Sequence, residues 1–391
     1  MPYPDRPPTV SDLKLPILQL MDAAWIESGY TAPNTVVYPW LWLWDSCFHA
    51  LIWAGLGRPD RAMSELLAAL ENQGPSGFVP HMGYQRDPDV AVDLWGRRSA
   101  SSITQPPMYG HVVRALVDQG VNVPETVLGK VRAGFRFLFE ERRREPVTGL
   151  VTVVHPWETG CDDSPRWDHF CPGRGFDLAR WRQHKIELLS SVEYSADGAP
   201  LANPAFAVAP IGFNALVAWN AMEFASVTGD QELSAQAREL ADRISQRWRP
   251  EVGTWADGGP DDTTSGEVRT ADALCALLVV DNVDQRRSAL RSLDQTGDFG
   301  GQFGPRGVHP DEPTYDPATY WRGPVWPQLA YLLWLAADRE GSREVAERVR
   351  QRTLAGAVAS GFAEYWNGET GVGGGAIPQS WAGVALLMAT D

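Results

Sequence analysis

One stretch of the sequence reads Phe213-Asn-Ala-Leu-Val-Ala-Trp-Asn-Ala-Met-Glu-Phe-Ala-Ser-Val-Thr-Gly229 and continues as Asp230-Gln-Glu-Leu-Ser-Ala-Gln-Ala-Arg-Glu-Leu-Ala-Asp-Arg-Ile244. The first part is apolar over most of its length, which predicts a helix buried in the interior. The second part repeats apolar residues at i, i+3 and i+4 between charged ones, which predicts an amphipathic surface helix. A buried helix, a short turn and a surface helix therefore form one unit.

The same unit recurs on both sides of this stretch, at 49–57 with 58–70 and at 326–337 with 341–354. An apolar inner helix with a charged outer partner is what two concentric rings of helices require. Further helices are expected at 17–28, 108–119, 124–143, 271–280, 288–296 and 380–389.

These segments amount to about a dozen helices with few strand-like runs, so the expected fold class is all-α. Long loops rich in Gly, Pro and Trp separate the helix pairs, and loops of such length in a compact domain are usually functional. They lie at 71–105, 145–175, 250–267, 296–323 and 361–379. Because the loops follow every second helix, we expect one (α/α) barrel spanning 1–391 as a single domain, with the loops at one rim.

Composition restricts the partners and the compartment. The formal net charge of −15 argues against nucleic acid or an anionic membrane as a partner. The sequence has no apolar run of 18 residues and no signal-peptide pattern, and its four cysteines lack disulfide or zinc spacing. The acidic cluster at 257–263 lacks EF-hand spacing and predicts a turn. We expect a cytoplasmic protein with no cofactor or metal, and the sequence indicates no particular oligomeric state.

Aromatic residues gather in a few of the loops. The chain has 17 tryptophans, many of them beside acids, a combination that suits stacking on sugar rings while polar groups bind the hydroxyls. Any single tryptophan is more often part of a core. The richest clusters are Tyr38–Asp45, Ser102–Pro107, Trp157–Asp168, Tyr320–Trp326 and Phe362–Trp381.

Two of these loops carry candidate catalytic acids. Hydrolysis of a glycoside needs one protonated carboxyl group, which protonates the leaving oxygen, and one ionised carboxylate, which activates water or attacks carbon. Asp162 and Glu364 lie about 200 positions apart in the two most aromatic acidic loops. Loops at one rim could bring them together on opposite faces of a sugar.

Other acids in these loops have two possible interpretations. Asp45 follows a tryptophan and could bind a sugar hydroxyl, or it could only cap a helix at 49–55. Asp163 and Asp168 could pair with Arg166 instead of taking part in chemistry.

Three of the motifs resemble those of known glycosidases. Trp157-Glu-Thr-Gly-Cys-Asp-Asp-Ser-Pro-Arg-Trp167 resembles the Glu-Ser-Gly-x-Asp-x-Ser-x-Arg-Trp motif of family 37 trehalases and family 63 glycoside hydrolases. Tyr320-Trp-Arg-Gly-Pro-Val-Trp326 resembles the Tyr-Trp-Arg-Gly-Pro-x-Trp signature of family 63 and its bacterial mannosylglycerate and glucosylglycerate hydrolase relatives. Trp42-Leu-Trp-Asp-Ser-Cys-Phe-His49 is also similar to those bacterial enzymes. The motifs extend from 38 to 381, nearly the whole chain.

The resemblance implies an (α/α)6 barrel and an inverting exo-α-glycosidase acting on a small α-glucoside or α-mannoside. By motif position, Asp162 matches the general acid and Glu364 the general base. Arg322 is expected to brace its loop through backbone carbonyls, with direct contact to the ligand as the alternative. The residues matched to positions around the sugar are Trp42, Trp44, Asp45, Gln105, Trp157 and Gly160, with Tyr38 and Tyr84 as weaker matches, and those matched near the leaving group are Tyr320, Trp321 and Trp326.

One segment departs from the glycerate-specific relatives, which carry a basic, tyrosine-containing segment that holds the glycerate carboxylate. At the corresponding place, 180–210, the relatives' pattern does not align. Arg180, Arg182 and Lys185 could hold an anion or form a solvated basic face.

Two alternative functions stay open. A sugar lyase or epimerase on an (α/α) barrel would use His49 or His81 as a base. A non-catalytic carbohydrate-binding relative would bind sugar without turnover.

Overall fold

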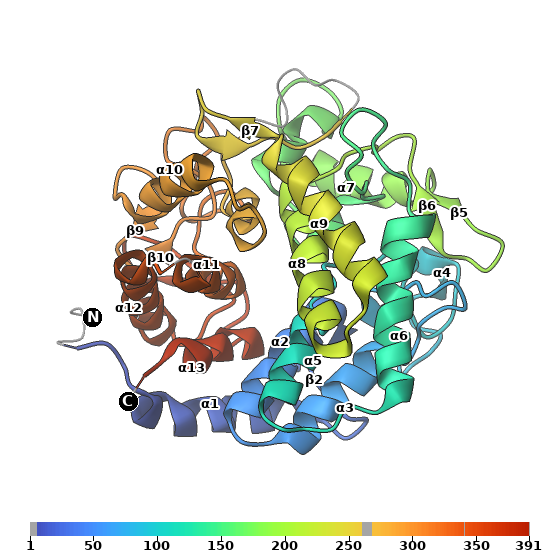
Figure 1. Ribbon diagram of the computed structural model, residues 1–391, viewed down its shortest axis with the longest axis horizontal. Helices are drawn as coiled ribbons and strands as arrows, with labels where there is room; N and C mark the ends of the chain where they lie inside the picture. Colours follow the sequence, from blue (N-terminus) through green and yellow to red (C-terminus); the bar gives the residue numbers. More distant parts are fainter. Residues whose placement is uncertain (1–5, 260–267, 340, 391) are drawn as a thin grey trace.

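The computed structural model describes residues 6–259, 268–339 and 341–390, which form two concentric rings of helices (Figure 1). In the described chain the inner ring consists of α2 (Leu43–Gly55), α5 (Tyr109–Asp118), α8 (Ile211–Thr228), the 3-10 helix η5 (Ala273–Leu278), α11 (Pro327–Arg339), and the 3-10 helix η6 (Ser380–Val384) with its continuation α13 (Ala385–Met388). The outer ring consists of α1 (Val10–Ala24), α3 (Pro59–Ala69), α6 (Glu125–Arg136), α9 (Gln231–Ser245), α10 (Val283–Asp294) and α12 (Arg343–Ala359).

Contacts between neighbouring helices close the inner ring. Around it, α2 touches α5, α5 touches α8, α8 touches η5, η5 touches α11, α11 touches η6, and η6 returns to α2. Outer helices pack on their inner partners, as α3 does on α2, α9 on α8 and α12 on α11 (Figure 1). The expected all-α double ring is therefore confirmed.

The α8–α9 pair illustrates how the sequence produces the two rings. Every residue from Ile211 to Ala221 in α8 is buried, as an inner helix requires. Gly229 ends this helix in the left-handed conformation at φ 72°, and the Asp230 side chain accepts the Leu233 N–H to begin α9. Helix α9 buries only one apolar stripe, which faces α8.

Several helix boundaries differ from the expected ones. Helix α1 begins at Val10 and passes through Pro16, and residues 271–280 form mainly the 3-10 helix η5. Helix α2 begins at Leu43 because the extended residue before it, Trp42, pairs in strand β3. Asp45 therefore lies inside the first turn of α2 and caps no helix.

Short antiparallel strand pairs occur within the loops. One pair supplies cavity residues: β3 (Leu41–Trp42) pairs with β4 (Met82–Gly83). A second pair, β11 (Tyr365–Trp366) with β12 (Gly373–Gly374), directly follows Glu364. The other pairs are β1 (Trp25–Ile26) with β2 (Tyr30–Thr31), β5 (Glu193–Tyr194) with β6 (Pro200–Ala202), β7 (Trp248–Arg249) with β8 (Thr254–Trp255), and β9 (Gly300–Gly301) with β10 (Gly304–Pro305).

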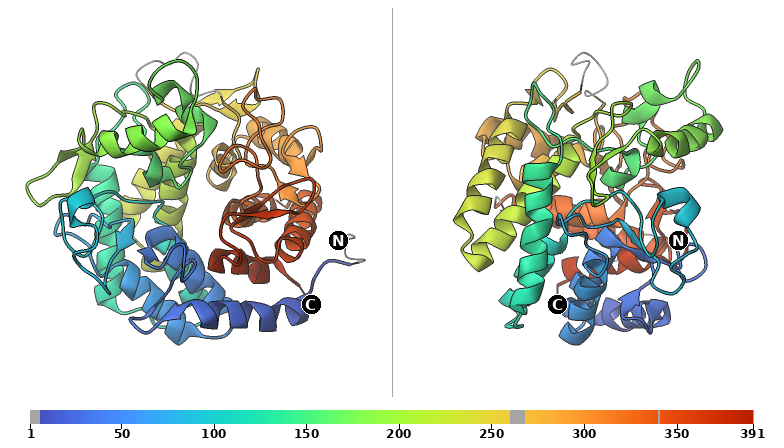
Figure 2. Two further views of the ribbon diagram at one scale, coloured as in Figure 1. Left: turned by 180° about the vertical axis from the view of Figure 1, so that it is seen from behind. Right: turned by 90° about the vertical axis from the view of Figure 1, so that its right-hand side faces the viewer.

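The loops also contain helices that the pattern does not predict, chiefly α7 (Leu178–Leu189) and the short α4 (Val92–Trp95). In the side view of Figure 2, α4 and α7 lie on one side of the ring, while α6 and α9 lie on the other. Among the residues described, no helix has the length and apolar character that crossing a bilayer requires.

Candidate active site

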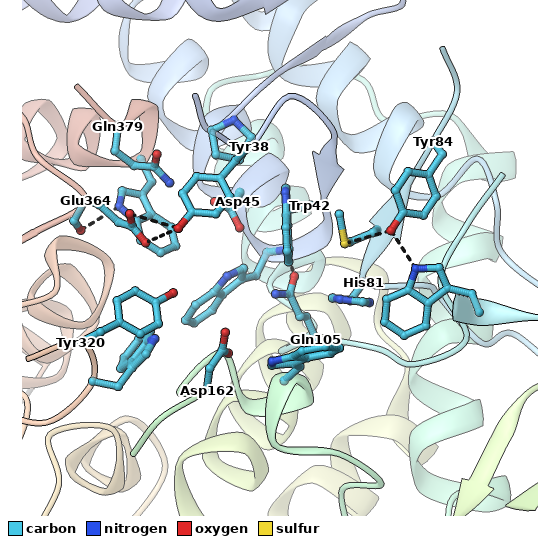
Figure 3. Close-up of a pocket in the computed structure, with 18 of the residues that line it drawn as sticks. Tyr38, Trp42, Asp45, His81, Tyr84, Gln105, Asp162, Tyr320, Glu364 and Gln379 are labelled. Atoms are coloured by element: carbon cyan, nitrogen blue, oxygen red, sulfur yellow. Dashed lines mark hydrogen bonds between the residues drawn. The ribbon is translucent and has the colours of Figure 1, made fainter. Parts of the chain in front are cut away.

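A cavity of about 260 Å³ opens among the loops (Figure 3). Its walls are mostly aromatic, and three carboxyl groups reach it. Of the residues expected at a sugar site, the structure brings together Tyr38, Trp42, Trp44, Asp45, Tyr84, Gln105, Trp157, Gly160, Asp162, Tyr320, Trp321 and Glu364.

Trp326 is the expected site residue that does not line the cavity. Its ring stacks on Trp321, with centroids 3.6 Å apart and an interplanar angle of 7°. Only 1% of Trp326 is exposed, so it supports the wall from behind. The motif spacing could not separate these two tryptophans, because both precede the same inner helix. Trp321 itself has φ 58°, a left-handed conformation that is uncommon outside glycine and turns the chain sharply at the wall.

The start of α2 supplies one wall of the cavity. Strand pairing places Trp42 opposite Met82, and the first helical turn then presents Trp44 and Asp45. The Trp44 N–H donates to Gln105 Oε1 at 3.4 Å, which ties the loop before α5 to this turn. Burial raises the pKa of the Asp45 carboxyl group well above its usual value, and nearby Glu364 adds to the effect.

The loop from Trp157 to Asp168, called the acid loop below, supplies the opposite wall. A 3-10 helix, η2 (Pro156–Thr159), presents Trp157 and ends at Gly160 in the left-handed conformation, at φ 72°. A Cβ atom at Gly160 would collide with the Trp44 ring. Glycine is therefore required both by the turn and by the close approach of two cavity walls.

Asp162 follows this turn and points into the cavity (Figure 3). Burial raises the pKa of its carboxyl group to about 7; Lys185 opposes the rise, while Asp163 and Glu364 add to it. Below neutral pH this side chain therefore carries a proton that it can donate.

Glu364 lies on another side of the cavity: in Figure 3 it is at the upper left, whereas Asp162 is at the bottom. The Tyr38 hydroxyl donates to its two carboxylate oxygens at 3.2 and 3.3 Å, and the Ala376 N–H donates to Oε2 at 2.8 Å. A Cβ atom at Gly375 would collide with Oε2, so the turn fits closely around the carboxylate. Burial raises the pKa of Glu364, and these donors oppose the rise.

Ion pairs within the acid loop differ from those expected from the sequence. Arg166 pairs with Asp257 at 3.0 Å and Asp272 at 2.7 Å, and not with Asp163 or Asp168. Residues 260–263 of the acidic cluster that begins at Asp257 lie outside the described residues.

Asp168 pairs instead with Arg322, and Asp163 pairs with Lys185. Asp168 receives two bonds from Arg322, at 2.8 and 2.7 Å, and Arg322 also donates to the Asp163 carbonyl at 3.3 Å. Asp163 pairs with Lys185 at 2.6 Å. Arg322 thus braces its loop partly as expected, through one carbonyl, but mainly through a carboxylate.

The basic residues at 180–185 have different environments. Arg180 is exposed and bonds to the Pro172 and Gly175 carbonyls, and Arg182 is exposed as well. Lys185 is buried, so it belongs to no solvated face.

The two histidines considered as possible bases, His49 and His81, differ in their position relative to the cavity. His49 is buried beside Ser380, 2.7 Å from its hydroxyl, and does not line the cavity. His81 does line it, but its Nδ1 is 2.6 Å from the Ser101 hydroxyl and burial lowers its pKa to about 3. His81 is therefore a neutral wall residue next to the Trp42 ring.

Several lining residues were not singled out from the sequence: Pro33, Met82, Leu94, Trp95 and Gln379. Trp95 donates to the Tyr84 hydroxyl at 2.8 Å, which fixes that ring at the wall. Gln379 is two positions before Trp381, which also lines the cavity and belongs to the last aromatic cluster. Its place beside that tryptophan in the sequence could therefore have indicated a site residue.

Comparison with known proteins gives consistent matches over nearly the whole chain. The family described as the mannosylglycerate hydrolase MGH1-like glycoside hydrolase domain matches residues 38–382. A mannosylglycerate hydrolase from Thermus thermophilus is 31% identical, covering 93% of this chain and 97% of the relative. A glucosylglycerate hydrolase from Mycolicibacterium hassiacum is 27% identical, with 91% and 93% covered. The crystal structure of a GH63 mannosylglycerate hydrolase from Thermus thermophilus in complex with Tris and D-glycerate superimposes with a TM-score of 0.81 at 25% identity, covering 96% of this chain and 99% of that one.

Proposed function

Because the chain belongs to the MGH1-like glycoside hydrolase family, we propose that it is an inverting exo-α-glycosidase with Asp162 as general acid and Glu364 as general base. The chain is a glycoside hydrolase. Its substrate is a small α-glucoside or α-mannoside, either a glycoside of glycerate, as its relatives' names indicate, or a related disaccharide. A cavity of about 260 Å³ suits such a compact ligand.

The observation that carries this proposal is a pair of carboxyl groups in one aromatic cavity with different surroundings. Asp162, with its pKa raised to about 7, retains a proton below neutral pH and can give it to a leaving oxygen. Glu364 accepts hydrogen bonds from Tyr38 and from the Ala376 N–H, which favour its ionised form. An ionised carboxylate can take a proton from water.

The reaction then follows from these two states. Asp162 transfers its proton to the glycosidic oxygen as the bond between that oxygen and the anomeric carbon breaks. A water molecule attacks the anomeric carbon from the opposite face, and Glu364 takes one of its protons. The products are a free sugar of inverted configuration and a neutral hydroxyl on the leaving group. Proton exchange with solvent restores both carboxyl groups.

Substitution of each acid tests the assignment. Asp162→Asn and Glu364→Gln should each lower kcat by about 10²–10⁴-fold, because each removes one partner of the acid–base pair. Turnover can be measured on glucosylglycerate, mannosylglycerate, trehalose, kojibiose and nitrophenyl α-glycosides. Asp87→Asn is the matched control, since Asp87 is exposed on a neighbouring loop and the substitution removes the same charge. Near-normal turnover by a folded Asp162 or Glu364 variant would refute the role given to that residue.

A further inference from the structure

Helix α7 is fastened to the acid loop by hydrogen bonds. The Trp181 indole N–H donates to the Asp162 carbonyl at 3.1 Å, and Lys185 Nζ donates to Asp163 Oδ1 at 2.6 Å. His155 Nδ1 accepts the Trp157 N–H, so its other nitrogen carries the proton and donates to the Lys185 carbonyl at 2.7 Å. The helix therefore holds the backbone at Asp162 and the side chain next to it.

The Lys185 ammonium group is enclosed by this arrangement. Its side chain is 5% exposed and that of Asp163 is 4% exposed. The indole rings of Trp157 and Trp181 flank the ammonium, with centroids 5.7 and 5.8 Å away. Within the described residues, Asp163 is the carboxylate paired with it. A buried ammonium is costly unless it is paired, so the pair fixes the Asp163 side chain in place.

The carboxyl groups of the adjacent residues Asp162 and Asp163 therefore have different surroundings. Asp163 points away from the cavity to a buried cation, whereas Asp162 lines the cavity. We propose that Lys185 is a positioning residue for the acid: by pairing with Asp163 it holds that side chain away from the cavity, so that Asp162 is the member of the adjacent pair that faces the substrate. This inference rests on the proposed role of Asp162 as general acid.

The charges around Asp162 determine the direction of the expected effect. Burial raises the pKa of Asp162, the Lys185 ammonium lowers it, and Asp163 and Glu364 raise it. Loss of the Asp163 charge alone should therefore lower this pKa, and loss of both charges should largely restore it. Within the described residues, other titratable groups that interact with Asp162 or Lys185 are Tyr38, Asp45, His155, Cys161 and Tyr320.

The test compares pH profiles of kcat/KM for Lys185→Met, Lys185→Arg, Asp163→Asn and the double variant Lys185→Met/Asp163→Asn. The alkaline limb reports deprotonation of the general acid. In Asp163→Asn, which keeps the ammonium, we expect this limb to move to lower pH by about one unit, and in the double variant to return toward the wild-type position. A buried charge without a partner is neutralised, so Lys185→Met should behave like the double variant. Lys185→Arg keeps the cation and should keep the limb within about 0.3 units of the wild-type position, which is close to pH 7.

A merely structural role for Lys185 predicts a different result. It would lower the rate of Asp163→Asn without moving its alkaline limb to lower pH, and that outcome overturns the proposal. If Lys185→Met does not fold, Asp163→Asn and the double variant decide, because the double variant leaves no unpaired buried charge. If the alkaline limb lies at the same pH in these two variants and in the wild type, the proposal is also overturned. Failure of the proposed function is distinguishable, because Asp162→Asn would then stay active.

Discussion

Burial raises the pKa of both candidate catalytic carboxyl groups, but the charges and hydrogen bonds around the two groups differ. Glu364 receives hydrogen bonds that favour its ionised form, from Tyr38 and the Ala376 N–H. Burial raises the pKa of Asp162 to about 7; in the buried pair beside it, Lys185 lowers this pKa and Asp163 raises it. The motifs could single out both acids but not these partners, because Tyr38 and Lys185 come from other segments and the fold of its own loop brings the Ala376 N–H to Glu364. Acid–base catalysis by two carboxyl groups needs surroundings that give the two groups different pKa values.

The raised pKa of Asp162 predicts a gain in stability when its charge is removed. An unfolded aspartate ionises near pH 3.8, whereas the folded one stays protonated up to about pH 7. The folded state therefore loses stability as pH rises between these values, and the loss is complete above pH 7. Asp162→Asn should raise Tm by about 2–5 °C at pH 8 and change it little at pH 4. Differential scanning calorimetry at both pH values measures this, with Asp87→Asn as control; an unchanged or lowered Tm at pH 8 would contradict it.

Among the elements, the acid loop is held by partners that are remote in sequence. Arg322, from the loop before α11, binds Asp168 through two bonds and the Asp163 carbonyl through a third. It thereby connects the loop of Asp162 to the loop of Tyr320 and Trp321, so two walls of the cavity share one anchor. Periodicity in the sequence could predict the helix pairs, because burial follows local spacing. It could not predict which cation meets which acid, because that depends on neighbours brought together by the fold.

The Arg322–Asp168 anchor should behave as one unit in a double-mutant cycle. Arg322→Lys loses the two-pronged geometry that a carboxylate matches, so we expect kcat/KM to fall by about tenfold or more and Tm by a few degrees. Asp168→Asn should have a similar effect, and the double variant should be little worse than either single one. Steady-state kinetics and thermal melts of all three variants test this. Fully additive losses would show that the two side chains act independently.

At the scale of the whole molecule, the closed inner ring brings loops from distant parts of the sequence to one cavity. Contacts run from α2 around to η6 and back to α2, so residues near 42 and near 381 lie in the same wall. Helix pairing and motif order were enough to predict the barrel and most of the lining. The sequence did not reveal α7 or the place of Trp326 behind Trp321, because both depend on packing between loops.

The most direct test of the account is the configuration of the first product. In the proposed mechanism one carboxyl group protonates the leaving oxygen while the other activates a water on the opposite face, so cleavage of an α-glycoside inverts the anomeric carbon. Proton NMR during the first minutes of hydrolysis, before mutarotation, should show the β-anomer of the released glucose or mannose. Initial release of the α-anomer would contradict the roles given to Asp162 and Glu364.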